Sequence, residues 1–93
     1  MTVTRSIFRY EVPVDDLWHA HDLSGAVLHV DCRDEQVVEF WALHSGGPTV
    51  RRWFRVYGTG QQLPEGRLQH RGTVIAPGGR LVWHLVEGPP AST

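Results

Sequence analysis

Apolar and polar residues alternate along most of this chain with a period of two, which is the spacing of β-strands that bury one face. Seven segments have the character of strands, six by this alternation and one as a nearly continuous apolar run, and glycine, proline or paired acidic residues separate them. The segments are residues 6–12, 17–23, 26–32, 37–44, 50–57, 67–75 and 80–87. No segment shows the period of about 3.6 residues that a helix would have. We therefore predict an all-β fold, a small antiparallel sandwich or barrel of about seven short strands.

Two segments indicate where the core lies. The alternation in segment 26–32 turns Leu28, Val30 and Cys32 inward. Segment 37–44 is apolar almost throughout, which indicates a strand that is covered on both faces or lies at an interface. Cys32 is the one cysteine of the chain, so no intrachain disulfide can form, and we expect it to be a core residue rather than a reactive thiol.

The connections between segments predict which strands are neighbours. Ser45-Gly-Gly-Pro-Thr49 has the length of a hairpin loop, so segments 37–44 and 50–57 are expected to pair antiparallel. Gly72 lies inside segment 67–75 and predicts a β-bulge or a close approach by another part of the chain.

Length and composition predict one domain that spans residues 1–93, ordered over about residues 6–87 with flexible ends. The 93 residues are 41% hydrophobic and 20% charged, as in soluble globular domains. No apolar run approaches the roughly 18–20 residues that cross a membrane, and Met1-Thr-Val-Thr-Arg-Ser6 lacks the apolar segment of a signal peptide. We expect no membrane partner, and a location in the cytoplasm or in a particle assembled inside a cell.

The charge balance limits the choice of partner. The net charge is -1 and the isoelectric point is about 6.6, which argues against a general binder of nucleic acids or anionic membranes. A net charge this close to zero also weakens repulsion between copies of the chain and so permits self-association. All nine basic residues are arginine, and lysine and asparagine are absent. We attribute this arginine bias to codon composition rather than to a chemical requirement.

An arginine–aromatic stripe lies on one face of segment 50–57. By alternation, one face of this strand belongs to the core, and Arg51, Trp53, Arg55 and Tyr57 share the other. Guanidinium groups stack on aromatic rings and bind carboxylates or phosphates, so the stripe is a candidate binding surface.

Three interpretations of this stripe are open. Its arginines form cross-strand ion pairs with Glu39 or Glu11, or the stripe contacts another protein, or it binds single-stranded nucleic acid. The slightly acidic net charge disfavours nucleic acid. In the protein-contact interpretation, Trp41 of the apolar segment 37–44 belongs to the same interaction face.

Two neighbouring segments contain a candidate metal site. Its ligands would be His19, His21, His29 and Asp31. The Ser24-Gly25 connection is short, so segments 17–23 and 26–32 are expected to be antiparallel neighbours whose polar faces meet. Three imidazoles and a carboxylate suit zinc or iron. The alternative is a solvated sheet face with no cofactor, because alternating polar residues are the ordinary pattern of such a face.

The aromatic content favours contacts beyond the core. Four tryptophans, three phenylalanines and two tyrosines occur in 93 residues, and each large aromatic side chain buries roughly 150–250 Å². So small a core cannot enclose all of them, and we expect some tryptophans to lie outside it. The chain also lacks a nucleophile elbow, a zinc-protease motif and a phosphate-binding loop, which favours a function that is not enzymatic.

Several blocks of the sequence point to a family. They are Phe8-Arg-Tyr-Glu-Val-Pro-Val14, Val27-Leu-His-Val-Asp-Cys-Arg-Asp34, Val37-Val-Glu-Phe-Trp-Ala-Leu43, Arg51-Arg-Trp-Phe-Arg-Val-Tyr-Gly-Thr-Gly-Gln61 and Leu81-Val-Trp-His-Leu-Val-Glu87. The chain resembles a family of small proteins, about 90 residues long, from actinobacteria and their bacteriophages, whose function is unknown. The resemblance covers about residues 7–87. It implies an actinobacterial or phage source and no catalytic residue, and it makes a phage particle a possible location.

We therefore expect an interaction module that is not an enzyme and that binds a protein partner or self-associates as a homo-oligomer. A metal-binding β-barrel is the first alternative. Nucleic-acid or nucleotide binding through the arginine–aromatic stripe is the second.

Overall fold

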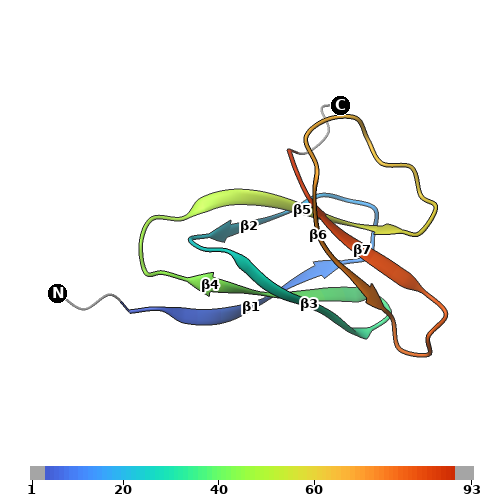
Figure 1. The fold of residues 1–93 in the computed structure, drawn as a ribbon, viewed down its shortest axis with the longest axis horizontal. Helices are drawn as coiled ribbons and strands as arrows, with labels where there is room; N and C mark the ends of the chain where they lie inside the picture. The colour runs from blue at the N-terminus through green and yellow to red at the C-terminus, as the bar shows by residue number, and fades with distance from the viewer. Residues whose placement is uncertain (1–3, 90–93) are drawn as a thin grey trace.

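A computed structural model describes residues 4–89 of the chain and shows seven β-strands in two antiparallel sheets (Figure 1). The strands are β1 (Ser6–Pro13), β2 (His19–Leu23), β3 (Val27–Asp34), β4 (Val37–His44), β5 (Val50–Gly58), β6 (Gln69–Ile75) and β7 (Val82–Glu87). Sheet A has the order β1-β4-β3, and sheet B has the order β2-β5-β7-β6. The sheets stack as an open sandwich, so the predicted all-β class is confirmed and the barrel is not formed.

Within residues 4–89 there is no helix, and hence none that could cross a membrane. The expectation of flexible ends concerns chiefly residues 1–3 and 90–93, which lie outside the described part of the chain.

The core lies between the inner faces of the two sheets. Phe40 of β4 and Phe54 of β5 meet across it, with ring centroids 4.6 Å apart, and both side chains are fully buried. The other buried members of this cluster are Val12, Leu23, Val38, Ala42, Val56 and Leu85. These residues lie at alternate positions of their strands, as the period-two pattern predicts. Complete burial of a side chain of this kind contributes roughly 1.5–3 kcal/mol.

Residues 45–49 do not form the predicted hairpin. β4 already pairs with β1 on one side and with β3 on the other, so both of its edges are occupied. The segment instead crosses from sheet A to sheet B, where β5 pairs with β2 and β7. The N–H of Ser45 donates to Oγ of Ser24 at 2.9 Å, which bonds this segment to the Ser24-Gly25 connection.

The Ser24-Gly25 connection is a second crossing, and the predicted pairing of its flanking strands is wrong. It leads from β2 in sheet B to β3 in sheet A. This crossing lies against β4, because the N–H of Leu43 donates to the carbonyl oxygen of Ala26 at 3.0 Å. A Cβ at position 25 would overlap the carbonyl oxygen of Leu43, so the contact requires glycine.

A bulge in β3 corrects one core prediction. The register against β4 shifts between Val27 and His29, which moves Leu28 out of the core and leaves it 51% exposed. Val27 and Val30 pack against the core cluster instead. Cys32 is buried, as predicted, and burial raises the pKa of its thiol, so it is not a reactive thiolate at neutral pH.

The prediction for Gly72 is confirmed in both of its forms. β6 has a register shift between His70 and Gly72. A Cβ on Gly72 would lie 2.7 Å from Cγ2 of Val30, so β6 reaches β3 of the opposite sheet at a residue without a side chain. Figure 1 shows β6 crossing beside β3 at this end of the molecule.

The tryptophans confirm that the aromatic content exceeds the core. Trp18, Trp41, Trp53 and Trp83 are all partly exposed. Among these four, Trp83 is the one that packs against the core cluster. The other three lie on surfaces of the sandwich.

Candidate interaction surfaces

The predicted metal site does not form. β2 and β3 belong to different sheets, so His19 and His21 do not meet His29 and Asp31. Residues 4–89 contain no group of three or more histidine, cysteine, aspartate or glutamate side chains that could hold a metal ion. The sequence-based grouping failed because it rested on a hairpin that is an inter-sheet crossing.

The two histidines of β2 bond to neighbouring parts of the chain instead. Nε2 of His19 donates to Oδ1 of Asp15 at 2.8 Å, and this hydrogen bond lowers the pKa of Asp15. Nε2 of His21 donates to the backbone carbonyl of Glu11 in β1 at 2.9 Å, which links the margins of the two sheets. Both rings therefore have structural partners.

The arginine–aromatic stripe lies on β5, but it is not one open surface. Nε of Arg51 donates to Oδ1 of Asp22, its cross-strand partner on β2, at 3.2 Å. Tyr57 is only 2% exposed, and Cζ of Arg55 lies 4.8 Å from the centroid of its ring. Trp41 lies on β4 in the other sheet, so the structure does not bring it together with the stripe.

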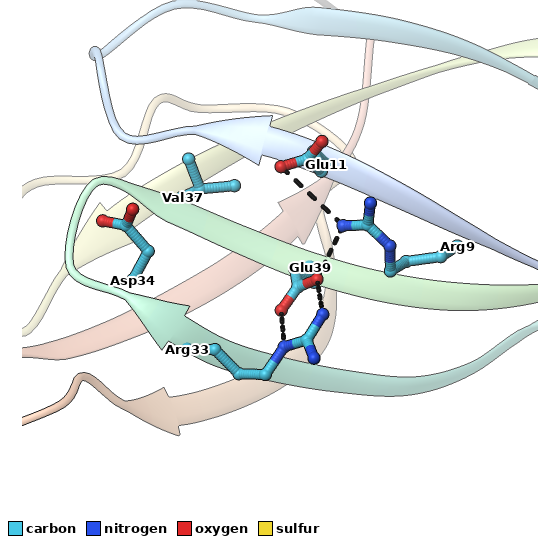
Figure 2. Close-up of a pocket in the computed structure, with 6 residues that line it drawn as sticks. All are labelled: Arg9, Glu11, Arg33, Asp34, Val37 and Glu39. Atoms are coloured by element: carbon cyan, nitrogen blue, oxygen red, sulfur yellow. Dashed lines mark hydrogen bonds and ion pairs between the residues drawn. The ribbon is translucent and has the colours of Figure 1, made fainter.

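Glu39 and Glu11, the expected partners of that stripe, lie on the outer face of sheet A (Figure 2). Nε and Nη2 of Arg33 donate to the two carboxylate oxygens of Glu39, each at 2.7 Å. Nη1 of Arg9 donates to Oε2 of Glu39 at 2.6 Å and lies 3.7 Å from Glu11. Because Arg9, Glu39 and Arg33 belong to β1, β4 and β3, they join all three strands, and we call them the sheet A clamp.

The sheet A clamp fixes the charge of Glu39. The hydrogen bonds from Arg33, opposed by burial and assisted by Arg9, lower the pKa of Glu39 to about 2, and Glu39 in turn raises the pKa of Arg33. A carboxyl group with so low a pKa exchanges no proton near neutral pH, so it is unsuited to general acid–base catalysis. The cavity of about 320 Å³ that these residues line contains arginines that are already bound, and we assign the clamp a structural role.

Sheet B has a second clamp of the same composition. Nε and Nη2 of Arg52 on β5 donate to Glu87 on β7 at 2.6 and 2.7 Å, and Nε of Arg71 on β6 donates to it at 2.8 Å. Nη1 of Arg52 also donates to the carbonyl oxygen of Gly25 at 2.8 Å. We call Arg52, Glu87 and Arg71 the sheet B clamp. Glu87 shares the inner face of β7 with Leu85, so this clamp borders the core.

The edges of the two sheets differ in how well they are protected. β2 is short, with five residues, β3 has two register shifts and β6 has one. β1 pairs with β4 over eight residues without a shift. Short strands and bulges protect an edge against pairing with another chain. Among the strands of residues 4–89, β1 is therefore the long, regular edge.

The backbone groups that β1 turns to its open side follow from the bond to His21. The carbonyl oxygen of Glu11 accepts that bond, so it faces away from β4. In an antiparallel pair, the N–H and C=O of one residue point to the same side, and successive residues alternate. Ile7 and Arg9 therefore also direct their N–H and C=O groups to the open edge.

Apolar side chains accompany these open backbone groups. Ile7 is 59% exposed and Phe8 is 46% exposed, although Phe8 stacks on His44 with ring centroids 4.8 Å apart. Figure 1 shows β1 along the margin of sheet A, leading to the N-terminal end of the chain. An edge strand with open backbone groups and exposed apolar residues is a site for β-strand addition.

The sequence interpretation missed both clamps and the open edge. One signal for the sheet A clamp was present, because Glu39 is a lone charge inside the apolar segment 37–44. A charge in such a position needs a partner. The strands that supply the partner depend on the sheet order, and the strand neighbours predicted from the connections were wrong.

The chain belongs to the family described as domain of unknown function DUF7352, whose model matches residues 3–93. No curated protein and no solved structure matches the chain. Membership in an uncharacterised family is thus confirmed, whereas the actinobacterial and phage range stays a prediction.

Proposed function

We propose that this protein is a non-enzymatic interaction module that self-associates by antiparallel pairing of β1 with β1 of a second copy. The open edge of β1 is the observation that supports the proposal most strongly. Strand addition would extend sheet A through main-chain hydrogen bonds, and exposed Ile7 and Phe8 would be covered. We place this assembly in the cytoplasm or in a phage particle.

The charges along β1 favour a second copy as the occupant. An antiparallel β1–β1 contact has twofold symmetry, so the same surface serves on both chains. In a register centred on Phe8, Ile7 lies opposite Arg9 of the other copy, and Arg5 lies opposite Glu11. Opposite charges directly across two strands stabilise the pair, and the two Phe8 rings lie close enough to contact each other. The net charge of -1 adds little repulsion.

The alternative functions have less support. The described residues hold no metal-binding group. In the arginine–aromatic stripe, Arg51 is bound to Asp22 and Tyr57 is buried. The row of accessible arginine side chains and aromatic rings that binds single-stranded nucleic acid is therefore not present.

Sedimentation equilibrium of the wild type and of Ile7→Pro tests the proposal. Proline removes the N–H at position 7, which faces away from β4, and it suits an edge strand, so the fold should be retained. A twofold dimer would lose two hydrogen bonds, each worth roughly 0.5–1.5 kcal/mol, which weakens the dimer about tenfold or more. We expect dimers for the wild type and mostly monomers for Ile7→Pro at the same concentration.

Ile7→Ala is the matched control, because it shortens the same side chain and keeps the N–H. We expect it to weaken the dimer less than Ile7→Pro does. A wild type that stays monomeric at about millimolar concentration, where even weak complexes form, contradicts the proposal. So does an Ile7→Pro variant that keeps its circular dichroism spectrum and dimerises as tightly as the wild type.

A further inference from the structure

Three buried hydrogen-bond donors gather on the outer face of sheet B. Nε1 of Trp18, Nε of Arg55 and the hydroxyl of Tyr57 are buried, and none has a hydrogen-bond partner among the described residues. The guanidinium of Arg55 lies over the Tyr57 ring. The Trp18 ring meets the Tyr57 ring edge-on, with the two ring centroids 6.5 Å apart. His19 is opposite Phe54 in the register, so Trp18 adjoins Arg55 across β2 and β5.

The composition of this group indicates what it would bind. An indole N–H and a guanidinium N–H can only donate, and a buried donor without an acceptor costs roughly 1–3 kcal/mol. Within residues 4–89 no carboxylate lies at ion-pairing distance from Arg55, whereas Arg51, Arg52 and Arg71 all have such partners. A ligand with a negatively charged acceptor group would satisfy the donors and the charge together.

Two cavities adjoin Tyr57. The smaller, of about 310 Å³, includes Arg55 in its lining, and the larger, of about 360 Å³, lies between sheet B and segment 58–68. Tyr57 and Leu63 line both cavities, so the two cavities are neighbours. A ligand that spans both would place its acceptor group beside Arg55 and the rest of its body against the lining of the larger cavity. These volumes are those of sites for small molecules.

The larger cavity suits an apolar group. Leu63, Leu68 and Val86 contribute aliphatic surface to it. The ring of His84, which also lines it, is held at both nitrogens, since Nδ1 lies 2.9 Å from Oγ1 of Thr73 and Nε2 lies 2.8 Å from Oγ1 of Thr59. The polar groups nearest to the cavity are thus bonded to one another, and apolar contact is what the remaining lining offers.

We propose that the outer face of sheet B binds a small carboxylate with an apolar body. In this site Arg55 and Tyr57 hold the carboxylate, Trp18 lies beside them against the Tyr57 ring, and the apolar body occupies the cavity beneath segment 58–68. This site uses no residue of the β1 edge, so it is independent of self-association. Glu65 also lines the smaller cavity and opposes an anion there, which limits the affinity at neutral pH.

The test uses the two unpaired N–H groups as reporters in ¹⁵N NMR spectra. Phenylacetate and octanoate are titrated into the full chain, with phenylacetamide as the uncharged match of phenylacetate. We expect saturable shifts of the Trp18 Nε1–H and Arg55 Nε–H signals with the carboxylates, and binding of the amide that is at least about tenfold weaker. The absence of saturable shifts with both carboxylates up to about 10 mM overturns the proposal.

Four variants assign the effect to this site. Tyr57→Phe removes the unpaired hydroxyl, so we expect unchanged or higher stability and about five- to tenfold weaker binding. Arg55→Gln should abolish binding, and Glu65→Gln should strengthen it. Arg51→Gln on the same strand is the control and should bind like the wild type. Equal losses of affinity for Arg51→Gln and Arg55→Gln would show general attraction by charge and contradict the site. Unchanged affinity for Tyr57→Phe would show that the ligand does not bond to this hydroxyl and would contradict it too.

Discussion

The two clamps have the same composition but different surroundings. In each, a glutamate on a strand with neighbours on both sides accepts hydrogen bonds from arginines of the two flanking strands. In the sheet A clamp the arginine side chains are 43% and 66% exposed, whereas in the sheet B clamp they are 20% and 28% exposed. The first lies on an outer face and the second borders the core.

From this difference we expect the location of an ion pair, more than its number of bonds, to decide its energetic importance. If Glu39 is removed, Arg9 and Arg33 can turn to water, so little charge is left without a partner. If Glu87 is removed, Arg52 and Arg71 stay half-buried, and desolvated charges without a partner are costly. Arg52 is also held by its bond to Gly25, so it cannot easily leave.

The largest effect is therefore expected for Glu87→Gln. We expect the free energy of unfolding to fall by about 3 kcal/mol, because two half-buried guanidinium groups lose their carboxylate. Urea unfolding followed by tryptophan fluorescence measures this value. A loss no greater than that caused by Glu39→Gln would contradict the role assigned to location.

Glu39→Gln should have a smaller effect, about 1–2 kcal/mol, because the loss is chiefly that of charge-assisted hydrogen bonds. The same urea series gives the value, and the dimer that we propose should persist, since Glu39 does not lie on the β1 edge. A Glu39→Gln variant that fails to fold would show that the sheet A clamp is a requirement for the sheet rather than an addition to it.

Acid should weaken both clamps, because both glutamates have lowered pKa values. The pKa of Glu39 is about 2, while burial raises that of Glu87 and the bonds from Arg52 and Arg71 outweigh it, so it lies below its ordinary 4.5. Between about pH 4.5 and pH 2 these carboxyl groups bind more protons in the unfolded chain than in the folded chain. The stabilisation is therefore complete above about pH 4.5 and falls as the pH drops towards 2. Urea midpoints at about pH 5 and pH 3 measure the loss.

The wild type should lose up to about 2 kcal/mol more stability over this interval than Glu39→Gln, which lacks one titrating group. Identical losses in the two proteins would show that Glu39 has an ordinary pKa in the folded state.

The smallest effect is expected for Asp22→Asn, which removes the partner of Arg51. The side chains of this pair are 53% and 65% exposed, and pairs of this kind contribute less than about 1 kcal/mol. Unfolding curves of this variant and of the wild type should nearly coincide. The pair thus provides the exposed reference against which both clamps are measured.

The strands could be predicted from the sequence because the period-two pattern is a local property. Segments 37–44 and 50–57 match β4 and β5 closely for this reason. Strand neighbours could not be predicted, since Ser24-Gly25 and residues 45–49 have lengths that serve a hairpin and an inter-sheet crossing equally well. The predicted histidine cluster assumed a hairpin at Ser24-Gly25, so it was wrong as well.

The candidate sites were less accessible to sequence reasoning for the same reason. Arg55 and Tyr57 were identified as an exposed stripe, but segment 58–68 folds back over Tyr57. Trp18 comes beside Arg55 only through the pairing of β2 with β5. The open edge of β1 likewise follows from bulges in other strands, and bulges such as that at Leu28 leave little trace in the alternation.

The sheet order has a consequence for the order in which the protein forms as it leaves the ribosome. The three strands of sheet A end at His44, whereas sheet B is complete only at Glu87. Sheet A can therefore assemble while half of the chain is still being made, with the apolar inner face of β4 uncovered until β5 and β7 arrive. β2 emerges before its partner β5 and has to wait for it. The nascent chain is thus most prone to aggregation after sheet A forms and before the β6–β7 hairpin closes over it.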